Sequence, residues 1–160
     1  MPRFGKILCP VDFDPNSIAA LDIACELAQE RKATVEVLHV VPIPLGPEVA
    51  IPFDKLERMA RARLERLARQ KINPKLRYTI HVKTGDPAGE VIHLANQTDA
   101  DLIVMATHGR RGLRRLMLGS VAERVVREAH CPVLTIKPTA LGRGARPSRA
   151  PAAARKRAQR

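Results

Sequence analysis

A loop between two apolar segments carries the residues best suited to chemistry. An unbroken apolar run, typical of a strand buried on both faces, ends in small residues and a glycine. After nine further residues, a glycine and a serine open a segment with helical spacing of apolar residues. Backbone N–H groups and the helix dipole converge at such a helix start, so the pattern predicts a binding site for the phosphates of a nucleotide. The residues concerned are Met105, Ala106, His108, Gly109, Gly119, Ser120 and Val121.

The same helix start has a purely structural explanation. Ser120 and Glu123 fit the S-x-x-E capping box, in which side chains satisfy the free N–H groups of the helix and no ligand is needed. Local spacing leaves both interpretations open.

The loop itself is basic. Its arginines are Arg110, Arg111, Arg114 and Arg115. A run of this kind is usually a solvated face. The alternative is that one or two of these side chains contact a γ-phosphate, for which the forked donors of Arg are suited, and Arg110 is therefore included among the candidate site residues.

The elements that must position these residues alternate along the chain. Apolar runs predict strands at 4–11, 34–41, 76–83, 102–105 and 131–137, and helical spacing predicts helices at 15–31, 56–67, 88–95 and 122–129. Asp14-Pro15 and Asp86-Pro87 each combine an N-cap with a proline in the first turn. Each connection between strands contains a helix, which demands parallel strands and right-handed crossovers. We expect a single doubly wound α/β domain, with a five-stranded parallel sheet, helices on both faces and a ligand at the carboxyl ends of the strands.

Catalytic signatures are absent from the sequence. It has neither the G-x-S-x-G elbow of hydrolases nor the G-x-x-x-x-G-K-[ST] phosphate loop of NTPases. No catalytic residue or metal ligand is predicted, and a role in nucleotide binding is favoured over one in turnover, with slow nucleotide hydrolysis at most.

The positive charge is concentrated at the C-terminus. The formal net charge is +12, but residues 139–160 hold seven of the 28 basic residues and no acid, which leaves +5 for residues 1–138. We expect a folded domain over 1–138 and a disordered basic tail over 139–160. Such a tail either contacts nucleic acid or another polyanion through counterion release, or only aids solubility.

Cysteine usage and hydropathy indicate the compartment. Three cysteines without a C-x-x-C pair argue against a disulfide framework or a zinc cluster and suit a reducing cytosol. No run reaches the ~18 apolar residues of a membrane span. The first residues lead directly into a strand rather than a signal peptide, so we expect a cytoplasmic protein.

Several of these motifs resemble the universal stress protein family. Thr107-His108-Gly109, nine residues and then Gly119-Ser120-Val121 are similar to its G-x-x-G-x9-G-[ST] signature, with Ala106 in place of the first glycine. Cys131-Pro132-Val133-Leu134 is similar to the last strand of the family, and Ile7 to Phe13 and Leu38 to Val41 to its first and second strands. The resemblance covers roughly residues 3–138.

The resemblance implies an adenine nucleotide alpha-hydrolase-like, Rossmann-like sheet that binds ATP, with Mg²⁺ as the accompanying cation. It places the nucleoside beside Asp12 with Pro10 and Val11, and the base beside Val40. The loop residues already listed would hold the ribose and phosphates. Homodimerisation through the last strand, Val133 to Ile136, is also implied.

Asp12 has its own alternatives. A carboxylate at a strand end next to a phosphate loop can accept hydrogen bonds from ribose hydroxyls or base amines, or hold a metal ion through water. Equally, Asp12 could cap the first helix together with Asp14. For the whole protein, the resemblance implies a nucleotide-dependent regulator of the stress response; the alternative is the same fold without nucleotide, acting through protein or nucleic-acid contacts.

Overall fold

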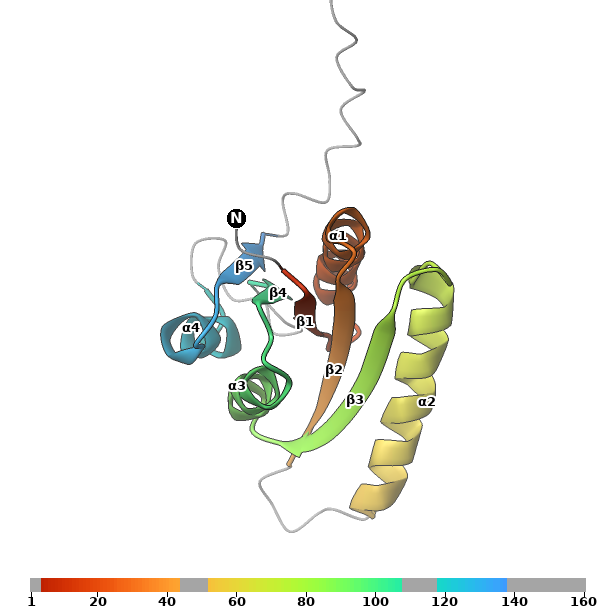
Figure 1. Cartoon of the computed structure of the whole chain (residues 1–160). Coiled ribbons are helices and arrows are strands. Elements are labelled where there is room, and N and C mark those ends of the chain that lie inside the picture. The colour runs from red at the N-terminus through yellow and green to blue at the C-terminus, as the bar shows by residue number, and fades with distance from the viewer. Residues whose placement is uncertain (1–3, 44–51, 108–117, 138–160) are drawn as a thin grey trace, which may run out of the picture.

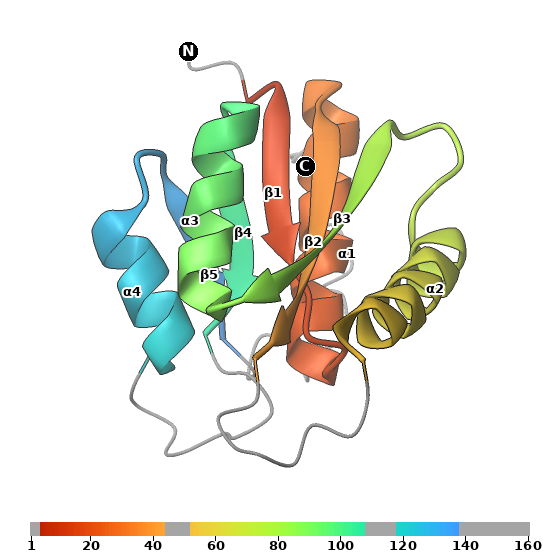
Figure 2. The ribbon, with the colours of Figure 1, turned by 90° about the horizontal axis from the view of Figure 1, so that it is seen from below.

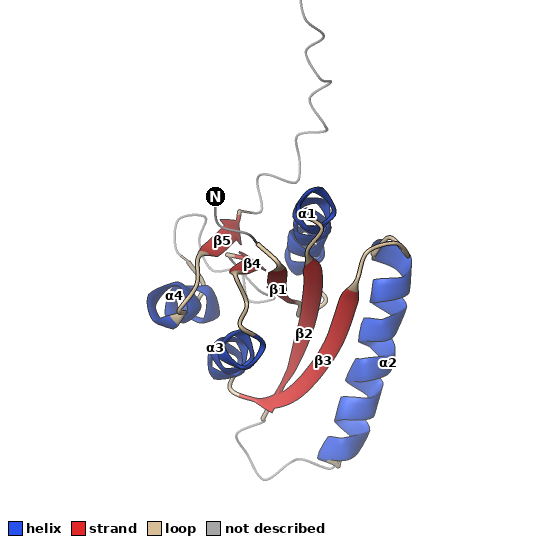
Figure 3. Cartoon of the chain, viewed as in Figure 1, coloured by secondary structure: helices blue, strands red, loops and turns tan. Residues whose placement is uncertain are grey.

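Five parallel strands form one sheet in the order β3-β2-β1-β4-β5. The computed structural model describes residues 4–43, 52–107 and 118–137. Along these residues the elements are β1 (Lys6–Pro10), α1 (Pro15–Arg31), β2 (Thr34–Pro42), α2 (Phe53–Lys71), β3 (Tyr78–Gly85), α3 (Pro87–Thr98), β4 (Leu102–Ala106), α4 (Ser120–Glu128) and β5 (Val133–Ile136). Strands and helices alternate throughout this part of the chain (Figure 3).

Helices cover both faces of the sheet (Figures 1 and 2). Side chains of α1 and α2 pack on one face and those of α3 and α4 on the other, in two separate clusters. The alternation of β1 produces this division, since Ile7 and Cys9 belong to the first cluster and Leu8 to the second. Full burial of a residue such as Leu8 stabilises the fold by about 1.5–3 kcal/mol.

The connections place a topological switch point between β1 and β4. The chain runs outward from β1 through β2 to β3, then returns to the other side of β1 to form β4 and β5. Ile7 and Leu8 pair with Leu102 and Ile103 across this point. In doubly wound sheets a crevice opens beyond the carboxyl ends of the two strands that flank such a reversal.

The predicted fold class, a doubly wound five-stranded parallel sheet with helices on both faces, is confirmed, with local corrections. The third strand begins at Tyr78 rather than Leu76, because the N–H of Leu76 bonds to the carbonyl of Asn73 in a turn at 2.9 Å. The fourth helix begins at Ser120, two residues earlier than its apolar spacing indicates. No helix in the described ranges is long and apolar enough to cross a membrane. The basic tail and the arginine loop lie outside the described residues.

Asp14 begins α1 as the sequence predicts. Its Oδ1 accepts the N–H of Ser17 at 2.7 Å, and Pro15 occupies the first turn. Burial raises the pKa of the Asp14 carboxyl above its ordinary value, and the nearby charge of Asp12 adds to the rise. The cap therefore titrates at a higher pH in the folded state than in the unfolded chain.

The Asp14→Asn variant tests this shift, because Asn caps equally well and does not titrate. As the pH falls from about 6 towards ~3.5, folded wild type takes up the proton before the unfolded chain does. Wild type should therefore gain stability relative to Asp14→Asn on acidification and lose this gain as the pH rises through the folded pKa. Urea unfolding of both proteins across this range measures the difference. A difference that is constant, or that grows with rising pH, would contradict the assignment.

Candidate functional site

Thr107 joins three elements at the carboxyl end of β4. The Gly119 N–H donates to its carbonyl at 2.7 Å, which fixes the start of α4 beside the end of this strand. The N–H and hydroxyl of Thr107 both donate to the Ile136 carbonyl, at 3.0 and 3.3 Å, which adds the end of β5. Thr107 is buried, so its contacts form a rigid base for the helix start.

The start of α4 has no internal cap. Gly119 is the N-cap residue, and no side chain in the part of the chain that the structure describes bonds to the helix start. The first N–H to donate along the helix is that of Glu123, to the Gly119 carbonyl at 2.9 Å. The N–H groups of Ser120, Val121 and Ala122 therefore have no acceptor among the described residues.

The capping-box interpretation of Ser120 and Glu123 is wrong. Ser120 is the first residue of the helix rather than its cap, and its exposed side chain forms no hydrogen bond within the described residues. Glu123 instead lies 3.9 Å from Arg127, one turn along the same helix. The helix start thus keeps its capacity for an anion.

Asp12 lies in a tightly bonded turn after β1. Its N–H donates to the Ser17 hydroxyl at 3.2 Å, and its Oδ1 accepts the N–H of Asp14 at 3.1 Å. Asp14, and not Asp12, caps the helix. The Asp12 side chain is half-buried, and its carboxylate lies beside that of Asp14, whose pKa it helps to raise.

Three of the predicted site residues pack on the α3/α4 side of the sheet. Val40 at the end of β2, Met105 at the end of β4 and Val121 at the start of α4 all belong to the cluster there. Pro10 and Ala106 are the last residues of β1 and β4, flanking the switch point. The sheet thus brings these residues to the carboxyl ends of its strands, where the sequence predicts a ligand.

Val11 differs from the other candidates. Its side chain is buried in the opposite cluster, under α1 and α2. Its N–H donates to the Leu38 carbonyl at 2.7 Å, and its carbonyl accepts from Nδ1 of His39 at 2.7 Å. Both main-chain groups are therefore already bonded. His108, Gly109 and Arg110 lie outside the described residues.

An ion pair ties α4 to α3. Arg124 lies 2.5 Å from Oδ2 of Asp86, the residue whose side chain also caps α3 through the N–H of Gly89 at 2.9 Å. Arg124 bonds to Glu128 on its own helix as well, at 3.2 Å. Hydrogen bonds from Arg127 and Arg124 hold the pKa of the Glu128 carboxyl below its ordinary value. These contacts orient α4 relative to its neighbour.

A metal ion at this site would take most of its coordinating atoms from a bound molecule and from water rather than from the protein. Within the described residues, no group of three or more His, Cys, Asp or Glu side chains could hold a metal. A single carboxylate such as Asp12 suits Mg²⁺, which keeps several waters and takes phosphate oxygens as ligands. The residues present therefore fit a cation that arrives with a nucleotide.

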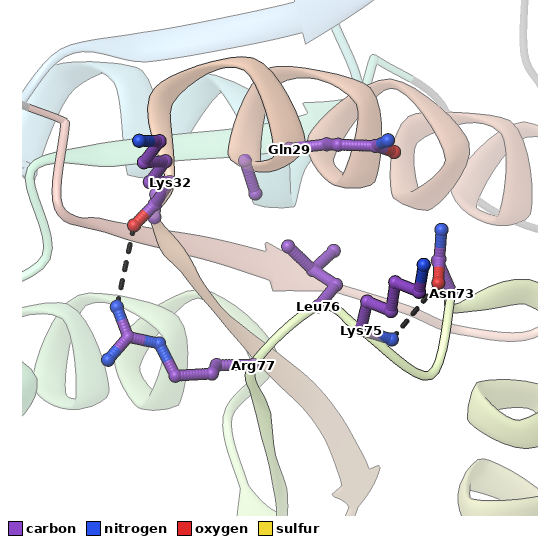
Figure 4. Close-up of a pocket in the computed structure, with 8 residues that line it drawn as sticks. Gln29, Lys32, Asn73, Lys75, Leu76 and Arg77 are labelled. Carbon is purple, nitrogen blue, oxygen red and sulfur yellow. Dashed lines mark hydrogen bonds between the residues drawn. The ribbon is translucent and has the colours of Figure 1, made fainter.

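A hollow of about 210 Å³ lies at the opposite end of the sheet, between the end of α1 and the turn before β3 (Figure 4). Lys32, Lys75 and Arg77 line it, and Arg77 donates to the Lys32 carbonyl at 3.5 Å. It lies beside the carbonyl end of α1, where the helix dipole disfavours anions. We assign it no part in the candidate site.

Sequence reasoning missed two features of the site. In the sequence Thr107 is only one residue of the signature-like motif, whereas in the structure it anchors three elements. Phe13 follows Asp12 with a left-handed φ of 67° and contacts the side chains of His39 and Arg63. Nothing in the local sequence signals these contacts, because they join β1, β2 and α2.

A parallel sheet with an uncapped helix start and a carboxylate at its switch point defines a Rossmann-like α/β domain. The chain belongs to the universal stress protein family, whose model matches residues 3–137.

Curated relatives agree with this assignment. Universal stress protein MJ0531 of Methanocaldococcus jannaschii is 36% identical over 142 residues, which cover 84% of this chain and 82% of the relative. Universal stress protein A homolog 1 of Coxiella burnetii is also 36% identical over 142 residues, covering 84% and 96% of the two chains.

Solved structures share the fold. Hypothetical protein MJ0577 superposes with a TM-score of 0.73 at 26% identity, covering 85% of this chain and 97% of that one. A universal stress protein in complex with cAMP superposes with a TM-score of 0.58 at 21% identity, covering 84% and 98%.

Proposed function

We propose that this protein binds ATP, with Mg²⁺, beyond the carboxyl ends of β1 and β4, and acts in the cytoplasm as a nucleotide-dependent regulator of the stress response. One observation carries the proposal. The uncapped start of α4 is fixed beside the end of β4 by the bond from Gly119 to Thr107, at the switch point of the sheet.

The groups at the carboxyl ends of β1, β2 and β4 and at the start of α4 suit the separate parts of ATP. The N–H groups of Ser120 and Val121, with the Ser120 hydroxyl, are donors for phosphate oxygens. The half-buried carboxylate of Asp12 is a candidate acceptor for a ribose hydroxyl, a base amine or a metal-bound water. Val40 supplies apolar surface for the base from the end of β2. Bound Mg²⁺ would neutralise part of the phosphate charge.

The comparisons support a nucleotide at the level of the fold. The complex with cAMP is evidence that a sheet of this type accommodates an adenine nucleotide in that protein. The choice of ATP for this chain rests on the resemblance of residues 107–121 to the family signature, and the open helix start supplies donors for phosphate oxygens.

Release of bound nucleotide tests the proposal. The chain has no Trp and a single Tyr, so adenine absorbance stands out clearly from that of the protein. The protein is incubated with Mg²⁺ and ATP, desalted and then denatured. It should release ATP, measured by its adenine absorbance, in proportion to the concentration of protein chains. A sample incubated with GTP serves as the control. Absence of adenine from the ATP sample would favour the same fold acting without nucleotide.

We also propose that the protein forms a homodimer through β5. This strand lies at one edge of the sheet, no strand of the described residues pairs with its outer side, and Leu134 on it is exposed. An uncovered edge strand with an apolar side chain is a template for pairing with a second copy.

Leu134→Lys is expected to convert this dimer into a monomer, because a lysine on an edge strand opposes pairing. Sedimentation velocity measures the change. Met59→Lys is the matched control, since Met59 is an exposed apolar residue on α2, which packs beside the opposite edge strand, β3 (Figure 1). Dissociation by Met59→Lys but not by Leu134→Lys would contradict the assigned interface.

A further inference from the structure

Phe13 has an unusual backbone conformation beside the candidate site. Three non-glycine residues in the described ranges have a positive φ: Phe13, Lys32 and Asp99. Lys32 and Asp99 are the C-caps of α1 and α3, where a left-handed residue is common. Phe13 caps no helix, and its φ of 67° is disfavoured for a bulky side chain.

The Phe13 ring is held by two other elements. The ring of His39, on β2, lies 4.4 Å away between centroids and is tilted by 45°. The Arg63 guanidinium, on α2, lies over the Phe13 ring, with its central carbon 4.1 Å from the ring centroid. Aromatic pairing and cation–π attraction both stabilise this arrangement. We refer to Phe13, His39 and Arg63 as the aromatic clamp.

The clamp acts on both neighbours of Asp12. Nδ1 of His39 donates to the carbonyl of Val11, the residue before Asp12, at 2.7 Å. The same imidazole packs against Phe13, the residue after it. One side chain of β2 therefore fixes the backbone on each side of the candidate nucleoside-binding carboxylate.

A turn with only a structural role would not need this arrangement. Glycine adopts a positive φ without steric cost, whereas phenylalanine here is strained and only half-buried. Strained conformations persist where the surrounding contacts over-determine them, and they concentrate at functional sites. The strained residue, Phe13, directly follows Asp12, the candidate nucleoside-binding carboxylate.

We propose that Phe13 is a positioning residue for the nucleoside end of the site: the aromatic clamp holds the Asp12 turn in the arrangement that meets the ligand. This inference rests on the proposed ATP function. It predicts that the clamp contributes to recognition of adenosine and not to recognition of the phosphates, which lie at α4.

Paired titrations with adenosine and ATP separate these contributions. Loss of the aromatic ring at position 13 should lower the affinities for adenosine and for ATP by the same factor, about tenfold. The ratio of the two affinities, which reports the phosphate contribution, should not change. A general structural defect would disturb α4 as well and alter this ratio.

The variants separate the ring from the backbone strain. Phe13→Leu keeps an apolar side chain but loses the aromatic contacts, and Phe13→Gly relieves the strain but leaves the turn unclamped. Both should lose adenosine affinity, whereas Phe13→Tyr keeps the ring and should bind within about twofold of wild type. Phe53→Leu, at an exposed aromatic on α2 that contacts no clamp residue in the described structure, is the matched control.

Folding is checked independently of binding. Titrations are performed well below the unfolding midpoint of each variant, and Phe13→Leu carries the test if Phe13→Gly does not fold. The Asp14 amide, which donates to Asp12 Oδ1, should exchange with solvent faster in Phe13→Leu than in wild type.

The outcomes distinguish this inference from the proposed function. If Phe13→Leu binds adenosine with wild-type affinity, or loses affinity for ATP only, the positioning role is overturned and the proposed function is not. If wild type binds neither adenosine nor ATP, the proposed function fails and the positioning role fails with it.

Discussion

Replacing Gly119 with valine is expected to abolish ATP binding while the protein remains folded. Gly119 is the N-cap of α4, and its backbone, at φ −64° and ψ 152°, lies in a region open to every residue type. The fold should therefore tolerate a side chain there, at a cost of about 1 kcal/mol for a poor N-cap. A branched side chain at this position would crowd the N–H groups of Ser120 and Val121, where the phosphates are proposed to bind.

The size of the effect separates this site from an incidental contact. We expect at least about a 100-fold loss of ATP affinity, equivalent to ~2.7 kcal/mol. Gly119→Ala adds a single methyl group and should fall between wild type and valine. Calorimetric titration gives the affinities, and thermal unfolding confirms the folded state. Unchanged ATP affinity in Gly119→Val would place the phosphates away from α4.

Asp12→Asn is expected to weaken the nucleoside end of the site without loosening the turn. The amide oxygen of asparagine can still accept the N–H of Asp14, as Oδ1 of Asp12 does at 3.1 Å. The charged acceptor is lost, and hydrogen bonds to charged groups contribute about 1.5–3 kcal/mol. Adenosine affinity should therefore fall by roughly 10- to 100-fold.

Adenosine is the sharper ligand for this variant, because removing a carboxylate also lessens repulsion of the ATP phosphates. Asp54→Asn removes a charge from an exposed ion pair on α2 and is the matched control. A second effect is expected on Asp14, whose pKa is raised in part by the charge of Asp12. Wild-type adenosine affinity in Asp12→Asn would remove Asp12 from the site.

Local signals predicted the elements and the starts of two helices. Asp14 and Asp86 each accept the N–H of the residue three positions later, as an aspartate before a proline predicts. These interactions span a few residues, so they can be recognised in the sequence. The parallel sheet followed from the same logic, since every strand is separated from the next by a helix.

The start of α4 could not be settled locally. Ser120 and Glu123 match a capping box, yet the N–H of Gly119 bonds to Thr107 and makes the glycine the N-cap. This bond joins residues that are twelve positions apart in the chain, and no local spacing encodes it. Tertiary contact therefore decided the role of Ser120.

The side of the sheet on which Val11 lies could have been predicted from the sequence. Its position next to Asp12 suggested a place in the site, but it is two residues from Cys9 and four from Ile7. The period of two along a strand assigns all three to one face, and the structure places them in the cluster under α1 and α2. The aromatic clamp, by contrast, depends on α2 reaching β1, which no strand or helix pattern reveals.

Titration of the wild-type protein with ATP in the presence of Mg²⁺ tests the central claim most directly. Calorimetry should record saturable heat of binding below about 1 mM ATP, a range that corresponds to a binding free energy beyond ~4 kcal/mol. The same titration of Gly119→Val should record none. An absence of heat from folded wild-type protein at these concentrations would contradict the account.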